Sequence, residues 1–444
     1  MKKLRIQALS GFNSLFSFSN VNQFGNSAKN AFSSLVVNLV GLLLNLFLTF
    51  LLAKQLSPIE FGVFSYIYTW LGILLIFSVL GFDSLLVRSI PKYNVENKNG
   101  HINGLLRYAN KTAFLSGLII SAIVLLVVSM LGFFQKNYIY GVVIALVSLP
   151  LMSLCLINEA ALRGIHKVVQ ARVPSIIVRP LIVCILVLGA YVVDQQLNSA
   201  DVLAFNLLGV IVALLLSNRY LANFARQIRS DRFQYEKQEW IATAFPLLLI
   251  AGMFSLLSYV DTIMIGMIGT INDVAVYTLA AKFAVLVLFV LQAFNVVVAP
   301  KVSEYFNGKE YEKLQAYVKL MSRIMFFATL PIMFCLLVFG ELFLRYFGDI
   351  YQGGYSVMVM LAIGQIVNVS FGPVAILLSM TQYQKLSFRI LLISLLVNIA
   401  LNIPAIYYFN ILGAAGATAI SIILRNYLMW IYAKKYLGIN SFII

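Results

Sequence analysis

Three positively charged side chains lie well inside apolar runs of the sequence: Arg179, Lys282 and Arg425. A charged side chain at the centre of a hydrocarbon layer costs about 3 kcal/mol on insertion scales, so it normally faces a water-filled cavity or a partner. Arginine and lysine both bind phosphate oxygens well. These residues therefore predict a cavity for an anionic cargo, with phosphate as the obvious group. The alternative is that each cation snorkels to the interface or pairs with a neighbour.

Three acidic side chains also lie inside the apolar runs. Asp83 lies near the end of the second run, Glu159 near the inner end of the fourth, and Asp261 in the seventh. Each could exchange a proton or a sodium ion with the cargo, or serve as an interhelical ion partner. We therefore treat these three carboxylates as candidates for ion coupling.

Uncharged polar residues extend this pattern. Thr278 precedes Lys282 by one helical turn, and Asn38 and Asn45 share a stripe in the first apolar run. Such residues also hold helices together, so the pattern supports the site without defining it. The predicted substrate-binding residues are Arg88, Arg179, Lys282, Arg425, Asn38 and Asn45.

The composition around these residues is that of a membrane protein. Of 444 residues, 61% are hydrophobic and only 11% are charged, with a mean hydropathy of +0.92. A soluble domain carries about 25% charged residues, so this surface must face lipid. The net charge of +16 does not indicate nucleic acid, because no basic cluster sits on a module that could fold in water.

The cysteines and histidines predict no disulfide, metal site or cofactor. Cys155, Cys184 and Cys335 lie inside apolar runs without CxxC spacing. His101 and His166 fall in expected loops between these runs.

Twelve apolar runs are long enough to cross about 30 Å of hydrocarbon. The predicted spans cover residues 31–53, 61–90, 112–134, 138–162, 173–194, 201–222, 240–267, 274–299, 320–341, 354–378, 388–408 and 411–433.

The lysines and arginines predict the orientation of these spans. Of the 32, 26 fall in the termini and in alternate connections, whereas the other connections hold only Lys54, Lys136 and Arg345. Such a bias places both termini in the cytoplasm. The outer connections are short, so no extracytoplasmic domain is expected to hold an active site.

The twelve spans divide into two halves. Ser57 with Glu60, and Thr270 with Asp273, place a hydroxyl at a helix N-cap with a carboxylate three residues later, and the two motifs lie 213 residues apart. Six spans per half predict two lobes related by a pseudo-twofold axis along the membrane normal, with a cavity between them. The expected segments are a cytoplasmic N-terminal segment, an N-lobe, a basic linker, a C-lobe and a cytoplasmic tail: 1–30, 31–222, 223–239, 240–437 and 438–444.

Three segments of the chain carry a family resemblance. They are residues 80–88 (LGFDSLLVR), 259–266 (YVDTIMIG) and 411–418 (ILGAAGAT). Their order and spacing resemble the polysaccharide (O-antigen, Wzx-type) flippases of the multidrug/oligosaccharidyl-lipid/polysaccharide (MOP) exporter superfamily. The resemblance runs from about Ala31 to Leu437, the whole membrane region.

The resemblance implies an all-α, MATE-like integral membrane protein with a V-shaped, cation-lined cavity between two six-helix lobes. It implies a flippase that moves an undecaprenyl-pyrophosphate-linked oligosaccharide from the cytoplasmic to the periplasmic leaflet of a bacterial inner membrane. The implied partners are this lipid-linked substrate, membrane lipids, and a polysaccharide polymerase with its chain-length regulator. The protein would act as a monomer and bind no nucleic acid.

Two other functions compete with this interpretation. A multidrug antiporter of the same superfamily takes cationic drugs and often uses an acid in its first helix, where this chain has Asn38 and Asn45. The basic cavity predicted above would repel such drugs. A membrane enzyme, such as a polymerase, would need a folded outer loop, and the sequence offers none.

Overall fold

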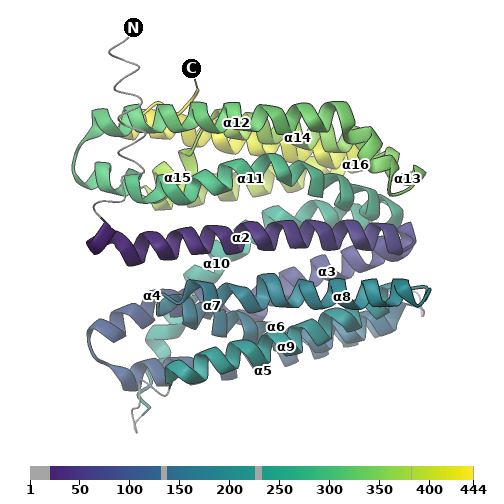
Figure 1. The fold of residues 1–444 in the computed structure, drawn as a ribbon, viewed down its shortest axis with the longest axis horizontal. Coiled ribbons are helices and arrows are strands. Elements are labelled where there is room, and N and C mark those ends of the chain that lie inside the picture. The colour runs from purple at the N-terminus through teal and green to yellow at the C-terminus, as the bar shows by residue number, and fades with distance from the viewer. Residues whose placement is uncertain (1–20, 132–137, 226–232, 382, 444) are drawn as a thin grey trace.

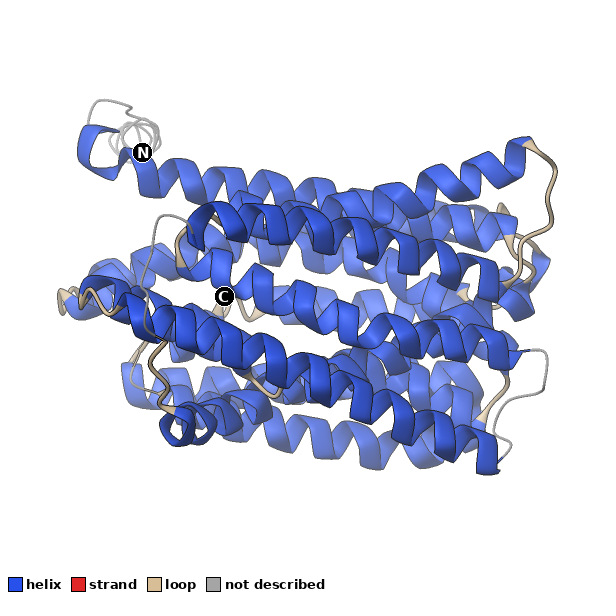
Figure 2. Ribbon diagram, turned by 90° about the horizontal axis from the view of Figure 1, so that it is seen from below, coloured by secondary structure: helices blue, strands red, loops and turns tan. Residues whose placement is uncertain are grey.

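The computed structural model describes residues 21–131, 138–225, 233–381 and 383–443, and in these ranges every regular element is a helix (Figure 2). The elements are α2 (Val21–Gln55), α3 (Pro58–Val79), α4 (Phe82–Val95), α5 (Asn99–Leu131), α6 (Ile139–Gly164), α7 (Val168–Arg172), η3 (Val173–Val178), α8 (Arg179–Val192), α9 (Ser199–Ala225), α10 (Lys237–Ile268), α11 (Ile271–Asn307), α12 (Tyr311–Arg345), α13 (Asp349–Gln352), α14 (Tyr355–Ser370), α15 (Val374–Ser379) and α16 (Gln384–Leu437).

Eleven membrane-length apolar segments are found among the described residues, and one of them contains two spans. The 54 residues of α16 would be about 80 Å long as a straight helix, far more than a bilayer needs. Its backbone breaks at Asn410, where φ is 50° and ψ is −136°. The two arms fold back on each other, since Ser394 Oγ donates to the Ser421 carbonyl at 3.0 Å. Counting each arm separately gives a number of spans that is consistent with the twelve predicted from the sequence.

The N-cap hydrogen bonds predicted at the starts of α3 and α11 are both present. The Glu60 amide donates to Ser57 Oγ at 3.3 Å, and Pro58 occupies the first helical position. At Thr270 the capping box is complete, because Asp273 Oδ2 also accepts from the Thr270 amide at 2.9 Å. Glu60 instead accepts from the Ser199 amide at 2.7 Å, which ties the start of α3 to the start of α9.

The prediction of one continuous span over residues 61–90 is wrong. The helix stops at Val79, and Leu80 and Gly81 adopt φ values of 54° and 77°. A Cβ atom on Gly81 would lie only 2.3 Å from the Ala244 carbonyl oxygen, so glycine permits both the turn and the contact with α10. Asp83 therefore lies on the separate helix α4 rather than in the second span.

Two other predicted spans are interrupted. The sequence predicts one continuous span over residues 354–378, but the helix is broken at residues 371–373, between α14 and α15. Gly372 has a φ of 67° there, and Pro373 follows it. The fifth span contains the π-helical turn η3, which begins at Val173, one residue before Pro174, and ends at Val178, one residue before Arg179.

The prediction that His101 lies in a loop is wrong, because His101 lies in the first turn of α5.

The helices form two groups (Figure 1). Helices α11–α16 gather on one side and α4–α9 on the other, with α2, α3 and α10 between them. We call the end of the bundle with the α4–α5 connection and residues 233–236 the basic end. The opposite end carries the α2–α3 and α10–α11 connections.

The two groups of helices close on each other at the opposite end. A core cluster there joins Leu56 and Phe61 from the first half to Val274 and Tyr351 from the second. The Lys54 ammonium also donates to the Tyr346 carbonyl at 3.0 Å.

Several predicted segment boundaries fall near residues that are not described. Residues 1–20 of the expected N-terminal segment lie outside the described ranges, and α2 already begins at Val21. Residues 226–232 of the expected basic linker also lie outside them.

Candidate functional site

A cavity of about 320 Å³ lies between the two groups of helices and receives side chains from α2, α3, α8, α9, α10 and α11. Arg179 and Lys282 both line it, and none of the described residues in its wall is acidic. The structure thus brings together two of the three cations found deep in the apolar runs. Its volume lies at the lower end of the range of about 300–1,000 Å³ that is usual for ligand pockets.

Arg179 is held in the cavity by neutral partners. It follows the π-helical turn η3 and precedes Pro180, and such turns are frequent at functional sites because they redirect side chains. Its Nε donates to Asn206 Oδ1 at 3.0 Å, and its guanidinium also donates to the Tyr68 hydroxyl. The guanidinium carbon lies 5.5 Å from the centre of the Tyr68 ring. These contacts orient the cation without neutralising its charge.

Lys282 faces the same cavity without a protein partner. Across the described residues it makes no hydrogen bond and no ion pair, although it is half-buried. Thr278, one turn earlier on α11, also lines the cavity, and its buried hydroxyl has no hydrogen-bond partner. Buried polar groups are nearly always paired. The ammonium and the hydroxyl are therefore both available to a ligand.

A second cavity of about 280 Å³ adjoins the first and shares Tyr68, Arg179 and Tyr259 with it. It reaches Asp83 and the turn at Gly81, where α3 gives way to α4. Arg179 therefore stands where the two spaces meet. The second cavity lies nearer the basic end, because it is lined by Gly81 and Asp83.

The other predicted binding residues lie in different places. Asn45 lines the first cavity, and its side-chain amide donates to the Gly41 carbonyl at 2.8 Å. Asn38 is half-buried on α2 and Arg425 half-buried on the second arm of α16, and neither lines either cavity. Arg88 is exposed on α4 and lines neither cavity.

Sequence reasoning missed the neutral polar residues that surround Arg179. Tyr68 and Tyr259 line both cavities, and Asn206 accepts from Arg179. One signal could have found Tyr68, because Ser65 and Thr69 accompany it at helical spacing within an apolar run.

Glu159 is engaged in a local ion-pair cluster. The residue is 6% exposed, and its carboxylate lies 3.8 Å from Arg163 Nε and 3.6 Å from Arg172 Nε. Arg163 follows one turn later on α6, and Arg172 ends α7. This arrangement ties the fourth and fifth spans together, which favours the structural alternative for Glu159.

Asp261 lies in a buried polar cluster built from α10, α11 and both arms of α16. Its carboxylate accepts from Tyr277 at 2.7 Å, from Asn402 at 3.0 Å and from Thr418 at 2.5 Å. Asn398 donates to the same threonine hydroxyl at 3.0 Å. No cation forms an ion pair with Asp261 in the part of the chain that the structure describes. A carboxylate among neutral oxygens and donors is suited to taking up a proton or a small cation.

Comparison with protein-family models identifies the family to which this chain belongs. The model described as "Polysaccharide biosynthesis protein" matches residues 27–306, more than half of the chain. The chain belongs to the polysaccharide biosynthesis protein family. A second model, MatE, matches residues 246–403. Membership of the MOP superfamily, which the resemblance predicts, is confirmed.

One curated relative of this family member is the "Probable low-salt glycan biosynthesis flippase Agl15" of Haloferax volcanii. The two chains are 24% identical over 255 residues, which is 57% of this chain and 53% of the relative. The alignment thus spans about half the length of that protein.

Solved structures confirm the fold of this family member. A multidrug resistance MATE family transporter of the MOP superfamily, in its inward-facing conformation, superposes with a TM-score of 0.76 at 13% identity, covering 92% of this chain and 98% of the other. The lipid II flippase MurJ, in an inward closed conformation, gives 0.67 at 15% identity, covering 90% and 87%. The chain is therefore an all-α, multi-pass membrane protein with a MATE-like fold.

Proposed function

We propose that this protein is a flippase for a polyprenyl-pyrophosphate-linked oligosaccharide. In a bacterial inner membrane the carrier would be undecaprenyl pyrophosphate and the glycan an O-antigen or capsular repeat unit. The observation that carries the proposal is the inter-lobe cavity, where Arg179 and Lys282 face the same space without an acidic partner. Unneutralised cations in a low-dielectric site favour a cargo with concentrated negative charge.

The physical task agrees with this cavity. A glycan and a pyrophosphate cannot cross hydrocarbon, whereas the polyprenyl tail can remain in lipid. A space lined by cations and hydroxyls can replace the water around the pyrophosphate. At about 320 Å³ the cavity suits the charged group, so a repeat unit of several sugars requires the lobes to open further.

The main alternative is a multidrug antiporter, since the MatE model matches part of the chain. The cavity argues against that function. Its wall holds Arg179 and Lys282 but no described acid, and such a wall repels cationic drugs. Family and cavity together support a transporter rather than an enzyme.

We further propose the arrangement that the sequence predicts for this activity. Both termini and the basic end would face the cytoplasm, and the two lobes, 31–222 and 240–437, would alternate about a pseudo-twofold axis. The oligosaccharide would move from the cytoplasmic to the outer leaflet. A monomer would suffice, delivering its product to a polymerase and chain-length regulator.

A reconstituted flipping assay tests the proposed function. Purified protein in liposomes is supplied with a fluorescent polyprenyl-pyrophosphate oligosaccharide, and dithionite bleaches whatever reaches the outer leaflet. We expect bleaching of nearly all the fluorophore with protein and about half without it, because only the outer leaflet is accessible to dithionite. Export of a cationic dye, with no movement of the glycolipid, would instead establish the antiporter function.

Ion coupling is proposed at Asp261, with Asp83 and Glu159 as the other acids that could contribute. Asp261 has the geometry best suited to it, since its partners are neutral and come from several helices. Asp83 lines the second cavity, whereas Glu159 is occupied by two arginines. Uptake of a cation at Asp261 would change how α10 packs on both arms of α16.

Asp261→Asn is expected to lower the initial flipping rate about tenfold, the scale of a coupling free energy of 1–3 kcal/mol. The amide cannot take up a proton or hold a cation as a carboxylate does. The rate is measured in liposomes with imposed proton or sodium gradients, and the variant should no longer respond to them. Tyr277→Phe is the matched control, since it removes one donor but keeps the carboxylate. A normal rate and a normal gradient response in Asp261→Asn would exclude coupling through this residue.

A further inference from the structure

A groove of about 690 Å³ lies on the outside of the bundle near its basic end, away from the inter-lobe cavity. One wall is the first half of α5, where Arg107, Lys111, Leu115 and Ile119 follow each other at intervals of four residues. This spacing places them on one helical face. All four side chains are exposed. The face therefore changes from cationic to apolar along the axis of a single helix.

The other wall comes from the segment that joins the two lobes. Tyr235 and Lys237, at the start of α10, line the groove opposite α5. The Lys237 ammonium lies 5.9 Å from the centre of the Tyr108 ring and 5.7 Å from that of Tyr235. Arg107 lies similarly over the Phe233 ring, at 5.1 Å. Aromatic rings thus hold the cations in place without neutralising them.

The groove has cations but no acid of its own. Within the described part of the chain, Arg107, Lys111 and Lys237 form no ion pair. Two acids lie close in sequence, Glu236 and Glu239, but neither lines the groove. Three cations with hydroxyls beside them are suited to a phosphate group.

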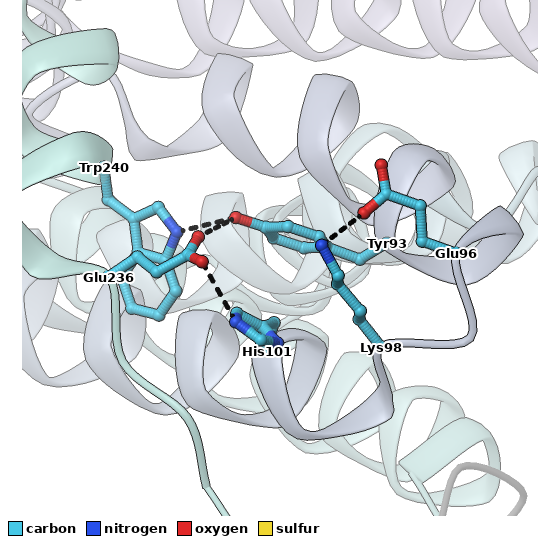
Figure 3. Close-up of polar contacts among 6 residues, drawn as sticks. All are labelled: Tyr93, Glu96, Lys98, His101, Glu236 and Trp240. Atoms are coloured by element: carbon cyan, nitrogen blue, oxygen red, sulfur yellow. Dashed lines mark hydrogen bonds and ion pairs between the residues drawn. The ribbon is translucent and has the colours of Figure 1, made fainter.

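Glu236 is engaged by a polar cluster next to the groove (Figure 3). It accepts from the Tyr93 hydroxyl at 2.8 Å, and His101 Nε2 lies 3.0 Å from its other oxygen. Trp240 donates to the same tyrosine at 3.0 Å. Burial raises the pKa of Tyr93 to about 12, so its hydroxyl keeps the proton that it donates. The cluster joins α4 and α5 to the start of α10.

A backbone contact fixes the same segment against α5. The Gln234 amide donates to the Gly100 carbonyl at 3.1 Å. In contrast, the Lys98–Glu96 ion pair beside the cluster is a surface contact and contributes little. The second wall is therefore held in place by the cluster and the backbone contact.

The apolar half of the groove indicates which phosphate compound it takes. Leu115 is 45% exposed and Ile119 is 58% exposed, and beyond Lys111 the helix carries no further charge to its end at Leu131. A free phosphate would leave these side chains unused, whereas a phospholipid would lay its acyl chains along them. Basic pockets at the membrane boundary are suited to anionic headgroups.

We propose that this groove is a binding site for an anionic phospholipid, with the headgroup phosphate between Arg107, Lys111 and Lys237 and the acyl chains along Leu115 and Ile119. The bound lipid bridges α5 to the first residue of α10. It therefore fastens the segment between the lobes to the first lobe and reinforces the contacts of the Tyr93–Glu236 cluster.

Native mass spectrometry of the purified full-length protein tests this site. The protein is mixed with equal amounts of phosphatidylglycerol and phosphatidylethanolamine, and bound lipids are counted. We expect preferential retention of phosphatidylglycerol, and at least about a tenfold loss of its affinity in the Arg107→Ala/Lys111→Ala/Lys237→Ala variant, because each cation near a membrane surface strengthens anionic binding severalfold. All three side chains are exposed, so the variant is expected to fold.

The matched control removes the same charge elsewhere. Lys319→Ala/Lys385→Ala/Arg389→Ala replaces three cations that line neither the groove nor the inter-lobe cavity, and it should retain phosphatidylglycerol. Equal loss in both triple variants, or equal retention of the two lipids by the unmodified protein, overturns the proposal.

A second variant separates a lipid from a free anion. Leu115→Gln/Ile119→Gln keeps the cations and alters only the apolar half, so it should weaken phosphatidylglycerol binding. Inorganic phosphate added at millimolar concentration should displace little lipid from the unmodified protein. If phosphate displaces the lipid efficiently and the Gln variant binds normally, the groove holds a free anion and the lipid proposal is wrong.

Discussion

Replacing either Arg179 or Lys282 with alanine is expected to lower glycolipid flipping by one to two orders of magnitude. A hydrogen bond to a charged group contributes about 1.5–3 kcal/mol, and both side chains face the inter-lobe cavity without an acidic partner. Loss of either cation would leave a pyrophosphate partly unpaired in a low-dielectric space. The initial rate of dithionite-accessible fluorescence in liposomes measures this effect.

The conservative and reversed variants distinguish charge from shape. Lys282→Arg should retain part of the activity, because a mobile pyrophosphate responds to charge more than to the geometry of the guanidinium. Lys282→Glu should be worse than Lys282→Ala, since repulsion adds to the lost contact. At Arg179 the planar group also orders Asn206 and Tyr68, so Arg179→Lys should lose more than Lys282→Arg.

A purely structural role for the two cations makes the opposite prediction. It would lower the amount of folded protein in the membrane, whereas a binding role leaves protein level and thermal stability unchanged. Arg389→Ala is the control for removal of a positive charge, because Arg389 is exposed and lines neither cavity. Well-folded alanine variants that flip at the normal rate would exclude both residues and leave Arg88 and Arg425 as candidates.

The sequence predicts the parts of this fold that depend on composition and local chemistry. Twelve spans follow from apolar length, and the capping box at Thr270 follows from a hydroxyl and a carboxylate three residues apart. The break at Leu80–Gly81 could not be predicted from hydropathy, because apolar residues continue on both sides of it. The close approach of α10 at the Ala244 carbonyl explains why a glycine is needed at this turn, and that contact joins segments far apart in the sequence.

The candidate site likewise contains residues that the sequence predicts and residues that it does not. Charge inside an apolar run is costly enough to mark Arg179 and Lys282 from sequence. The tyrosines around Arg179 carry no such cost, since neutral polar residues also serve in helix packing. Arg88 lies beyond the break in the second span, so its distance from the cavities depends on a turn that the sequence pattern does not reveal.

The largest conformational effect is expected at Gly62, where α3 meets α11. A Cβ atom at this position would lie 2.2 Å from the Ile271 carbonyl oxygen. Nearby, Phe61 and Tyr351 pack edge to face with ring centres 6.4 Å apart. Gly62→Val must therefore push the two helices apart, and such overpacking costs about 1–3 kcal/mol. This cost falls on the state that is closed at this end.

Gly62→Val is expected to shift the protein toward a state open at the end that carries the α2–α3 connection, and to slow flipping about tenfold or more, since 1.4 kcal/mol changes an equilibrium tenfold. A cysteine at Thr278, in a background without Cys155, Cys184 and Cys335, reports on the cavity. An impermeant thiol reagent added from that side should label it faster in the variant.

Gly416→Val is the matched control, because a Cβ at Gly416 would meet no atom within 4 Å. It should change neither labelling nor flipping, which separates the effect of the contact from that of a larger side chain in a membrane helix. If the cavity cysteine reacts equally in folded Gly62→Val and Gly416→Val proteins, the contact between α3 and α11 does not hold this end closed. The lobes would then have to close on other contacts, of which the bond from Lys54 to the Tyr346 carbonyl is the next to test.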